Sequence, residues 1–489
     1  MHPDDAENPP HPIHHTNIDI LGEIFVHCLA EVPPNRNPDD LSPRNEKECW
    51  ISETQIRLRQ QQPFRLAAVC RSWRVACLAT PRVWQTLDIS LNGAALIRAG
   101  AAATMVNDVL RYSGATPLRI RIFHWLYSTS RDRQWDDPEV ELLVTTLQAA
   151  MARCGMLVVS GHISRQLALD PLSRILRVNT PQLRAASLCG GFWVCGLDER
   201  VQPPPEACIL PDVSRLCLLE IDGSFLSGFR DMASFVNVQK AVLRSNTWVG
   251  IDRDLAFRFL STAPRLTTVI VDNPIMDQTS FPAPQAAICD SVRKFSLNID
   301  SNTLVRSWGG STVELDLSVM LQLSFPRLEE IELQGCNKSA PKCITLLRHL
   351  VSREHTTHVV LHAMCSTIAF LPALEQARKL RSLTLTGLSF DNWDHLEGWY
   401  DDFMVLVQNH GARWQQELEE LYLYDVVFKA PWKAPDSARL ACSTGETSFL
   451  VFPHLKRFEV AEKGLKGISV CYNLLAGTTD LRSTAHYDT

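Results

Sequence analysis

Residues 325–333 read FPRLEEIEL, a proline turn followed by apolar residues at i, i+3 and i+5. Successive copies of this apolar triplet begin between 24 residues (356 to 380) and 38 residues (380 to 418) apart, which predicts a chain of repeated structural units. The copies are Leu183/Ala186/Leu188, Val213/Leu216/Leu218, Val238/Ala241/Leu243, Leu266/Val269/Val271, Val292/Phe295/Leu297, Leu328/Ile331/Leu333, the degenerate Thr356/Val359/Leu361, Leu380/Leu383/Leu385, Leu418/Leu421/Leu423 and Leu455/Phe458/Val460.

Each unit reads as a helix, a turn that often contains proline, and a short strand. Proline cannot continue a helix and favours extended geometry in the residue before it. The spacing and period are those of leucine-rich repeats, in which stacked units bury the triplets together. We therefore expect an α/β fold in which a leucine-rich-repeat solenoid of parallel strands alternating with helices spans residues 92–480. An α/β domain with a parallel sheet is the alternative.

The side chains between the triplet positions point away from the core in such a repeat. They include our candidate substrate-binding residues, namely Glu330, Glu332, Glu420, Tyr422 and Tyr424. Tyrosine is common at interaction hot spots. The tyrosines would lie beside the acids of residues 330–332 only if the intervening units are in register, and a solvated face is the alternative. Only scattered Lys294 and Arg457 add positive charge, so we expect no phosphate pocket.

The first 91 residues follow a different pattern. Residues 1–15 are polar and Pro-rich and should be disordered. Ile20, Leu21, Ile24 and Phe25 recur at helical spacing, and residues 33–62 should form a long loop with a marginal helix over 48–62. A second apolar helical face follows from residue 66 to residue 77. Two such faces on so small a unit must pack on each other or cover a partner.

Three segments of this region resemble the F-box. LAAVCRSWR at 66–74 is similar to the signature L-x-x-V-C-[KR]-x-W-[RK], and TPRVWQTL at 80–87 is similar to the segment that follows it. ILGEIF at 20–25 resembles the first helix. The pattern is most similar to F-box-like proteins of mushroom-forming fungi that carry leucine-rich repeats. Residues 16–19 read TNID where the family usually has Leu-Pro, and the 33–62 insertion is longer than in compact F-boxes.

The resemblance implies that residues 16–91 form an F-box-like helical domain that docks on the Skp-type adaptor of an SCF-type cullin–RING ubiquitin ligase. The solenoid would then bind a protein substrate, and residues 481–489 would be a tail. The implied adaptor-binding residues are Ile20, Leu21, Ile24, Phe25, Leu66, Val69, Trp73 and Trp84. Core packing inside this chain is the alternative for each. A ligase-independent scaffold is the alternative function.

Composition limits the remaining function classes. The net charge of −6 gives no electrostatic case for nucleic acid or an anionic membrane surface, and no apolar run reaches the length of a membrane helix. The 15 cysteines are an odd number, and many lie in apolar surroundings. The N-terminus does not read as a secretory signal. We therefore expect a reduced protein of the cytoplasm or nucleus. We find no phosphate loop, nucleophile elbow, zinc motif or cofactor motif and expect neither metal, cofactor nor enzymatic activity, although a hydrolase or transferase on an α/β fold is a further alternative.

Overall fold

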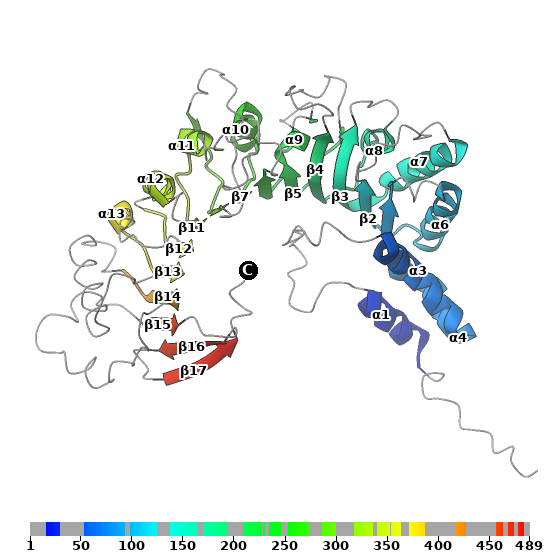
Figure 1. Ribbon diagram of the computed structural model, residues 1–489, viewed down its shortest axis with the longest axis horizontal. Helices are drawn as coiled ribbons and strands as arrows, with labels where there is room; N and C mark the ends of the chain where they lie inside the picture. The colour runs from blue at the N-terminus through cyan, green and yellow to red at the C-terminus, as the bar shows by residue number, and fades with distance from the viewer. Residues whose placement is uncertain are drawn as a thin grey trace, which may run out of the picture. The chain divides into compact units, whose positions relative to one another are not determined.

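The computed structural model describes residues 16–29, 53–92, 98–124, 137–164, 170–193, 209–226, 228–229, 234–245, 253–272, 286–299, 317–335, 340–352, 354–362, 371–386, 417–426, 456–462, 468–473 and 478–483 (Figure 1). The predicted tail at 1–15 and most of the 33–62 insertion lie outside these ranges. The chain forms two compact units. Unit 1 comprises Met1–Ile221 and Ser227–Ser234, and unit 2 comprises Asp222–Leu226 and Phe235–Thr489.

Unit 1 begins with helices and continues into a parallel sheet. The helices are α1 (Ile18–Leu29), α3 (Glu53–Val69), α4 (Arg71–Ala79), the 3-10 helix η2 (Pro81–Trp84), α6 (Ala99–Tyr112), α7 (Pro138–Met151) and α8 (Pro171–Leu176). The strands are β1 (Thr86–Ser90), β2 (Leu118–His124), β3 (Cys154–Ser164), β4 (Ala185–Trp193) and β5 (Leu218–Asp222). They lie in chain order and each pairs in parallel with the next. Unit 1 is therefore an α/β structure.

Two boundaries in unit 1 differ from the sequence prediction. The sheet begins with β1, inside the 16–91 range assigned to the helical domain. The marginal helix expected over 48–62 is present from residue 53, but it forms part of α3, which continues through Pro63 to Val69. The apolar helix expected from residue 66 to residue 77 is divided, because Cys70 adopts an extended backbone (φ −157°, ψ 174°) between α3 and α4, and its Sγ accepts a hydrogen bond from Trp73 N.

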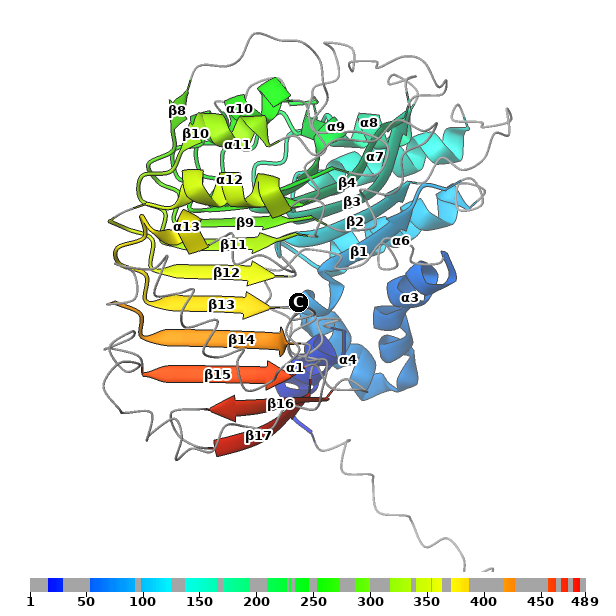
Figure 2. The ribbon, with the colours of Figure 1, turned by 60° about the vertical axis from the view of Figure 1, so that its left-hand side comes forward.

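Unit 2 repeats the alternation of helices and parallel strands (Figure 2). Its helices are α9 (Gly223–Leu226), α10 (Arg253–Thr262), α11 (Ser318–Gln322), α12 (Ala340–Leu350) and α13 (Leu371–Leu374). Its strands are β6 (Lys240–Arg244), β7 (Thr268–Asp272), β9 (Lys294–Asn298), β11 (Glu330–Gln334), β12 (His358–His362), β13 (Ser382–Thr386), β14 (Glu420–Val426), β15 (Arg457–Glu462), β16 (Ile468–Asn473) and β17 (Thr478–Ser483), with β8 (Ala287–Ile288) and β10 (Leu323–Ser324) forming a separate small pair.

The order of the main strands in unit 2 is β6-β7-β9-β11-β12-β13-β14-β15-β16-β17. The parallel pairing ends at β15, because β16 and β17 form antiparallel pairs. This antiparallel end was not predicted, and β17 extends three residues beyond the expected end of the repeats at residue 480.

The proline turns explain how each unit enters its strand. Thr180, Ala263 and Phe325 each accept a hydrogen bond at the backbone carbonyl from the amide three residues later, over 3.0, 3.3 and 3.2 Å. Proline occupies the second position of each of these turns, where its fixed φ is favourable. The amide that closes the turn belongs to the first residue of the triplet. Each turn therefore aims the triplet into the core, where the described triplet residues that match the strands are buried.

One repeat lies three residues from its predicted position. The predicted triplet was Val213/Leu216/Leu218, but β5 buries Leu219 and Ile221 and leaves Leu218 partly exposed. Leu219 pairs with Ala186 and Ile221 with Leu188, so the true triplet begins at Leu216. The prediction failed because Val213, although buried, belongs to the turn: its carbonyl accepts the Leu216 amide.

The degenerate copy at Thr356 is confirmed as a structural repeat. Thr356 is fully buried where other units have an aliphatic residue. Its Oγ1 donates to Leu328 O over 3.2 Å and accepts from Ser352 N over 2.9 Å. Both hydrogen-bonding roles of the hydroxyl are satisfied, which removes the usual penalty for burying it.

Candidate interaction surfaces

Helix α1 has two apolar faces, of which only one is buried. Leu21 and Phe25, four residues apart, are almost fully buried. Ile20 and Ile24 form the neighbouring stripe and remain exposed. Burying both stripes would require a second partner for α1, and within the described residues the chain supplies only the first.

Helix α4 continues this arrangement. Its Trp73 ring lies 4.9 Å from the ring of Phe25, centroid to centroid, and Ala76 and Cys77 are buried. Val75 and Leu78, on the opposite face of α4, are exposed. Burial raises the pKa of the Cys77 thiol to about 11, so this cysteine is a packed residue and not a reactive one.

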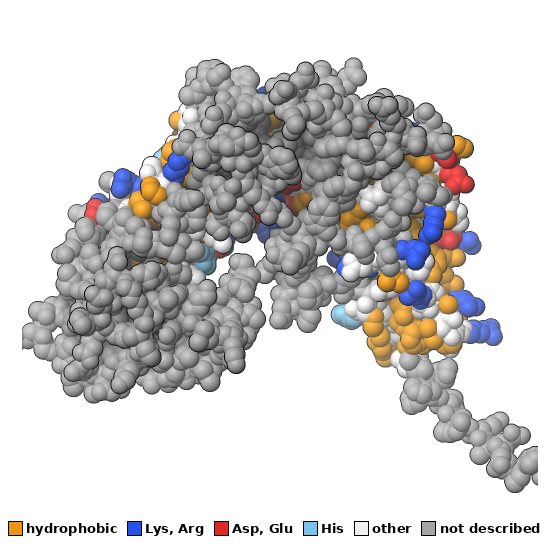
Figure 3. All heavy atoms as spheres, in the orientation of Figure 1, with side chains coloured by type: hydrophobic (Ala, Val, Ile, Leu, Met, Phe, Trp, Pro, Cys, Tyr) orange, Lys and Arg blue, Asp and Glu red, His pale blue; other side chains and the backbone are white. Residues whose placement is uncertain are grey.

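Seven large aliphatic side chains, each 39–60% exposed, form what we call the helical surface: Ile18, Ile20, Ile24, Leu58, Val69, Val75 and Leu78. They come from α1, α3 and α4. Figure 3 shows hydrophobic side chains gathered over these helices. They account for most of the exposed large hydrophobic side chains among the described residues. A concentration of this kind is typical of an interaction site.

The predicted adaptor-binding residues divide between this surface and the interior. Ile20, Ile24 and Val69 belong to the helical surface. Leu66 and Trp73 are partly buried, whereas Leu21, Phe25 and Trp84 lie in the core. Trp84 donates from Nε1 to Cys77 O over 2.8 Å. Ile18, Leu58, Val75 and Leu78 were not among the predicted residues, although the spacing of Val75 and Leu78 along α4 is that of one helix face.

A different side of the helices packs on the sheet of unit 1. The Trp84 ring lies between Phe64 of α3 and Tyr112 of α6, with ring centroids 5.0 and 4.8 Å away. Gln60 of α3 also donates a hydrogen bond to Asp88 O of β1. The contacts that join the helices to the sheet therefore do not use the exposed aliphatic residues.

The second candidate surface is the polar side of the unit 2 sheet, which we call the strand face. It consists of the first, third and fifth residues of strands β7, β9, β11, β12, β13 and β14. The strands are in register: Thr268, Lys294, Glu330, His358, Ser382 and Glu420 are successive partners, and so are Ile270, Ser296, Glu332, Val360, Thr384 and Tyr422. Burial alternates along β7, β11 and β12 as predicted, whereas Ser296 of β9 and Ser382 and Thr386 of β13 lie on this face but are buried.

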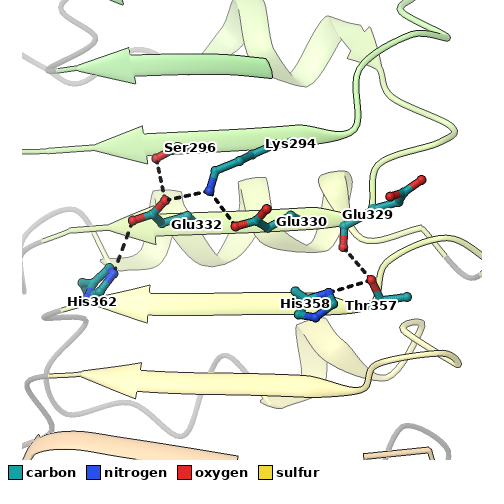
Figure 4. Close-up of polar contacts among 8 residues, drawn as sticks. All are labelled: Lys294, Ser296, Glu329, Glu330, Glu332, Thr357, His358 and His362. Carbon is teal, nitrogen blue, oxygen red and sulfur yellow. Dashed lines mark hydrogen bonds and ion pairs between the residues drawn. The ribbon is translucent and has the colours of Figure 1, made fainter. Parts of the chain in front are cut away.

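Charged groups on the strand face pair with one another (Figure 4). Lys294 Nζ lies 2.6 Å from Glu330 Oε1 and 3.8 Å from Glu332 Oε2. Ser296 Oγ donates to Glu332 over 3.3 Å, and His362 Nε2 lies 3.5 Å from Glu332 Oε1. Glu330 and Glu332, the predicted substrate-binding acids, are thus held by their own neighbours.

Neighbouring carboxyl groups on this face experience opposite electrostatic environments. A hydrogen bond with His362, helped by the charge of Lys294, holds the pKa of Glu332 below its ordinary value despite partial burial. Burial raises the pKa of Asp272, against the opposing effect of Arg244, whose Nε lies 3.0 Å from Asp272 Oδ2. The strand face is therefore a network of compensated charges rather than a field of one sign.

The structure does not bring the predicted tyrosines and acids together. Strands β12 and β13 separate β11 from β14, so Glu332 and Tyr422 lie three strand spacings, about 14 Å, apart. Tyr422 instead accepts a hydrogen bond from Arg457 Nη1 over 3.1 Å. Glu420 is partly buried and is the strand partner of Arg457. The side chain of Tyr424 lies outside the described residues.

In the part of the chain that the structure describes, no three His, Cys, Asp or Glu side chains are grouped as a metal site requires. Over the same residues, none of the helices has the length and apolar character needed to cross a membrane. Compared with models of protein families and with curated proteins, the chain matches none.

Proposed function

We propose that this protein is a substrate-receptor subunit of an SCF-type cullin–RING ubiquitin ligase. In this proposal residues 16–91 are an F-box-like domain that docks on the Skp-type adaptor, and the leucine-rich repeats bind a protein substrate. The chain performs no covalent chemistry. It holds a substrate near the transferring enzyme and so raises the effective concentration of the reacting groups.

The observation that carries this proposal is the helical surface. Ile20, Ile24, Val75 and Leu78 project from helices whose other sides already pack on one another and on the sheet. Fully burying one such aliphatic side chain contributes about 1.5–3 kcal/mol. The sequence resemblance at 66–74 and 80–87 falls on the segments that form α3, α4 and η2.

A ligase-independent scaffold is the second candidate. The packing of Phe64 on Trp84 and the hydrogen bond from Gln60 to Asp88 O join the helices to the sheet, which favours a domain that serves the repeats. The sequence TNID at 16–19, where the F-box family usually has Leu-Pro, favours it as well.

Capture of purified Skp-type adaptor by the full chain separates the two functions. The test variant is Ile20→Asp with Ile24→Asp, because both side chains are exposed and charge there leaves the core intact. Phe25 is unsuitable, since a buried aspartate at that position would unfold the domain. The matched control is Leu142→Asp, an equally exposed aliphatic residue on α7.

Under the ligase proposal, wild type and the Leu142→Asp control capture the adaptor and the double variant does not. Circular dichroism and thermal melting should show all three proteins equally folded. If folded wild-type protein fails to capture the adaptor, the scaffold function replaces the proposal.

A further inference from the structure

Two of the three helices that carry the helical surface, α3 and α4, have an unusual charge content, whereas α1 carries Asp19 and Glu23. Residues 54–79 contain five arginines, at positions 57, 59, 65, 71 and 74, and neither aspartate, glutamate nor lysine. Ordinary exposed helices carry lysine and glutamate. Protein interfaces are enriched in arginine and depleted in lysine, aspartate and glutamate. Apart from Glu53 at the start of α3, the composition of α3 and α4 is therefore that of an interface.

The arginines occupy the same faces as the aliphatic residues. On α4, Arg71, Arg74, Val75 and Leu78 follow the i, i+3, i+4, i+7 spacing of one helix face, and all four are exposed. On α3, Arg57 and Arg65 are exposed with Leu58 and Val69. In Figure 3 basic side chains border the hydrophobic ones over these helices.

Four of the five arginines have no anionic partner among the described residues. Arg57, Arg65, Arg71 and Arg74 form no ion pair with any residue that the structure describes. Arg74 only donates to Ala67 O, over 3.1 Å, and Arg65 to Gln61 Oε1, over 3.4 Å. By contrast, Arg82 pairs with Glu23 and Arg121 with Asp88.

We infer that the partner of the helical surface is an acidic protein, with carboxylates arranged around an apolar groove. The aliphatic residues fill the groove, and the four arginines meet the carboxylates, for which the planar guanidinium is well suited. A nucleic acid would also attract the arginines, but the exposed aliphatic residues between them offer neither stacking surfaces nor hydrogen bonds to it. This inference rests on the proposed function and adds the chemistry of the partner.

The test measures association and dissociation rates of the full chain with purified Skp-type adaptor at about 50 mM and about 500 mM salt. The variant is Arg57→Glu with Arg71→Glu, whose side chains make no described ion pair. The matched control is Arg327→Glu with Arg378→Glu, two exposed arginines of unit 2. A parallel measurement uses a labelled single-stranded RNA of mixed sequence.

We expect charge reversal at Arg57 and Arg71 to lower the association rate constant about tenfold at low salt, with a smaller change in dissociation. High salt should slow wild type and erase most of this difference, and the control should match wild type. If the adaptor binds at rates that depend neither on salt concentration nor on charge reversal at Arg57 and Arg71, the acidic-partner inference is wrong and the proposed function stands. Absence of adaptor binding by wild type overturns both. RNA binding that the reversal abolishes also overturns the inference, in favour of a nucleic acid.

Discussion

On the strand face Lys294 lies 2.6 Å from Glu330 and Arg244 lies 3.0 Å from Asp272, whereas Arg57 and Arg71 of the helical surface have no ionic partner among the described residues. The strand face thus satisfies its own charges, and a ligand there must compete with existing pairs. The helical surface exposes both apolar area and uncompensated charge. The strand face can select a ligand through hydrogen bonds, whereas burial of the helical surface contributes the larger share of binding free energy.

The largest expected change in the free energy of unfolding comes from the core residues that support the helical surface. Trp84, at the end of η2, packs between α3 and α6, so Trp84→Ala should lower the free energy of unfolding by about 3–5 kcal/mol. Ile24→Asp, on the exposed stripe of α1, should change it by less than about 0.5 kcal/mol. Urea unfolding measures both. Equal destabilisation by the two variants would mean that the exposed stripe is core.

An intermediate effect is expected where α1 approaches the end of α4. A Cβ atom at Gly22 would overlap Thr80 Oγ1, so Gly22→Ala should destabilise by about 1–3 kcal/mol through overpacking. The double variant with Thr80→Ala should recover part of the loss in the same unfolding assay. If Gly22→Ala is neutral, α1 does not pack closely on that junction.

The smallest expected change in the free energy of unfolding comes from a substitution on the strand face. His362→Ala removes the hydrogen bond that lowers the pKa of Glu332, and a partly exposed pair of this kind contributes about 0.5 kcal/mol. Because the folded-state pKa of Glu332 lies below its unfolded value, the contribution is present above about pH 4.3 and is lost as the pH falls through the folded value.

The measurement is the difference in unfolding free energy between wild type and His362→Ala across acidic pH. This difference should be constant near neutral pH and shrink at low pH. A difference that grows on acidification would contradict the assigned pairing of Glu332.

The repeats were predictable because the triplets must be buried for the units to stack, and this requires apolar residues at i, i+3 and i+5 in each unit. The prediction slipped at residues 213–218 because Val213 also lies three residues before a leucine, so spacing alone could not separate turn from strand. The break at Cys70 has no proline or glycine to announce it. On α1, Ile20/Ile24 and Leu21/Phe25 are chemically alike, and only the packing of Trp73 and Thr80 decides which stripe is buried.

The charge pairs of the strand face were also beyond sequence reasoning. Tyr422 and the acids at 330 and 332 share a face, as predicted, but their separation depends on which strands lie between them. The arginine content of α3 and α4 was visible in the sequence. Its meaning required knowing which arginines are exposed and which have carboxylate partners.

Hydrogen–deuterium exchange of the full chain, with and without the Skp-type adaptor, tests the central claim most directly. Docking on the helical surface should slow exchange of backbone amides in Ile18–Leu29 and Arg71–Ala79 and leave the strands from Glu330 to Thr386 unchanged. Unchanged exchange throughout α1 and α4 in the presence of saturating adaptor, or protection confined to the strand face, would contradict it.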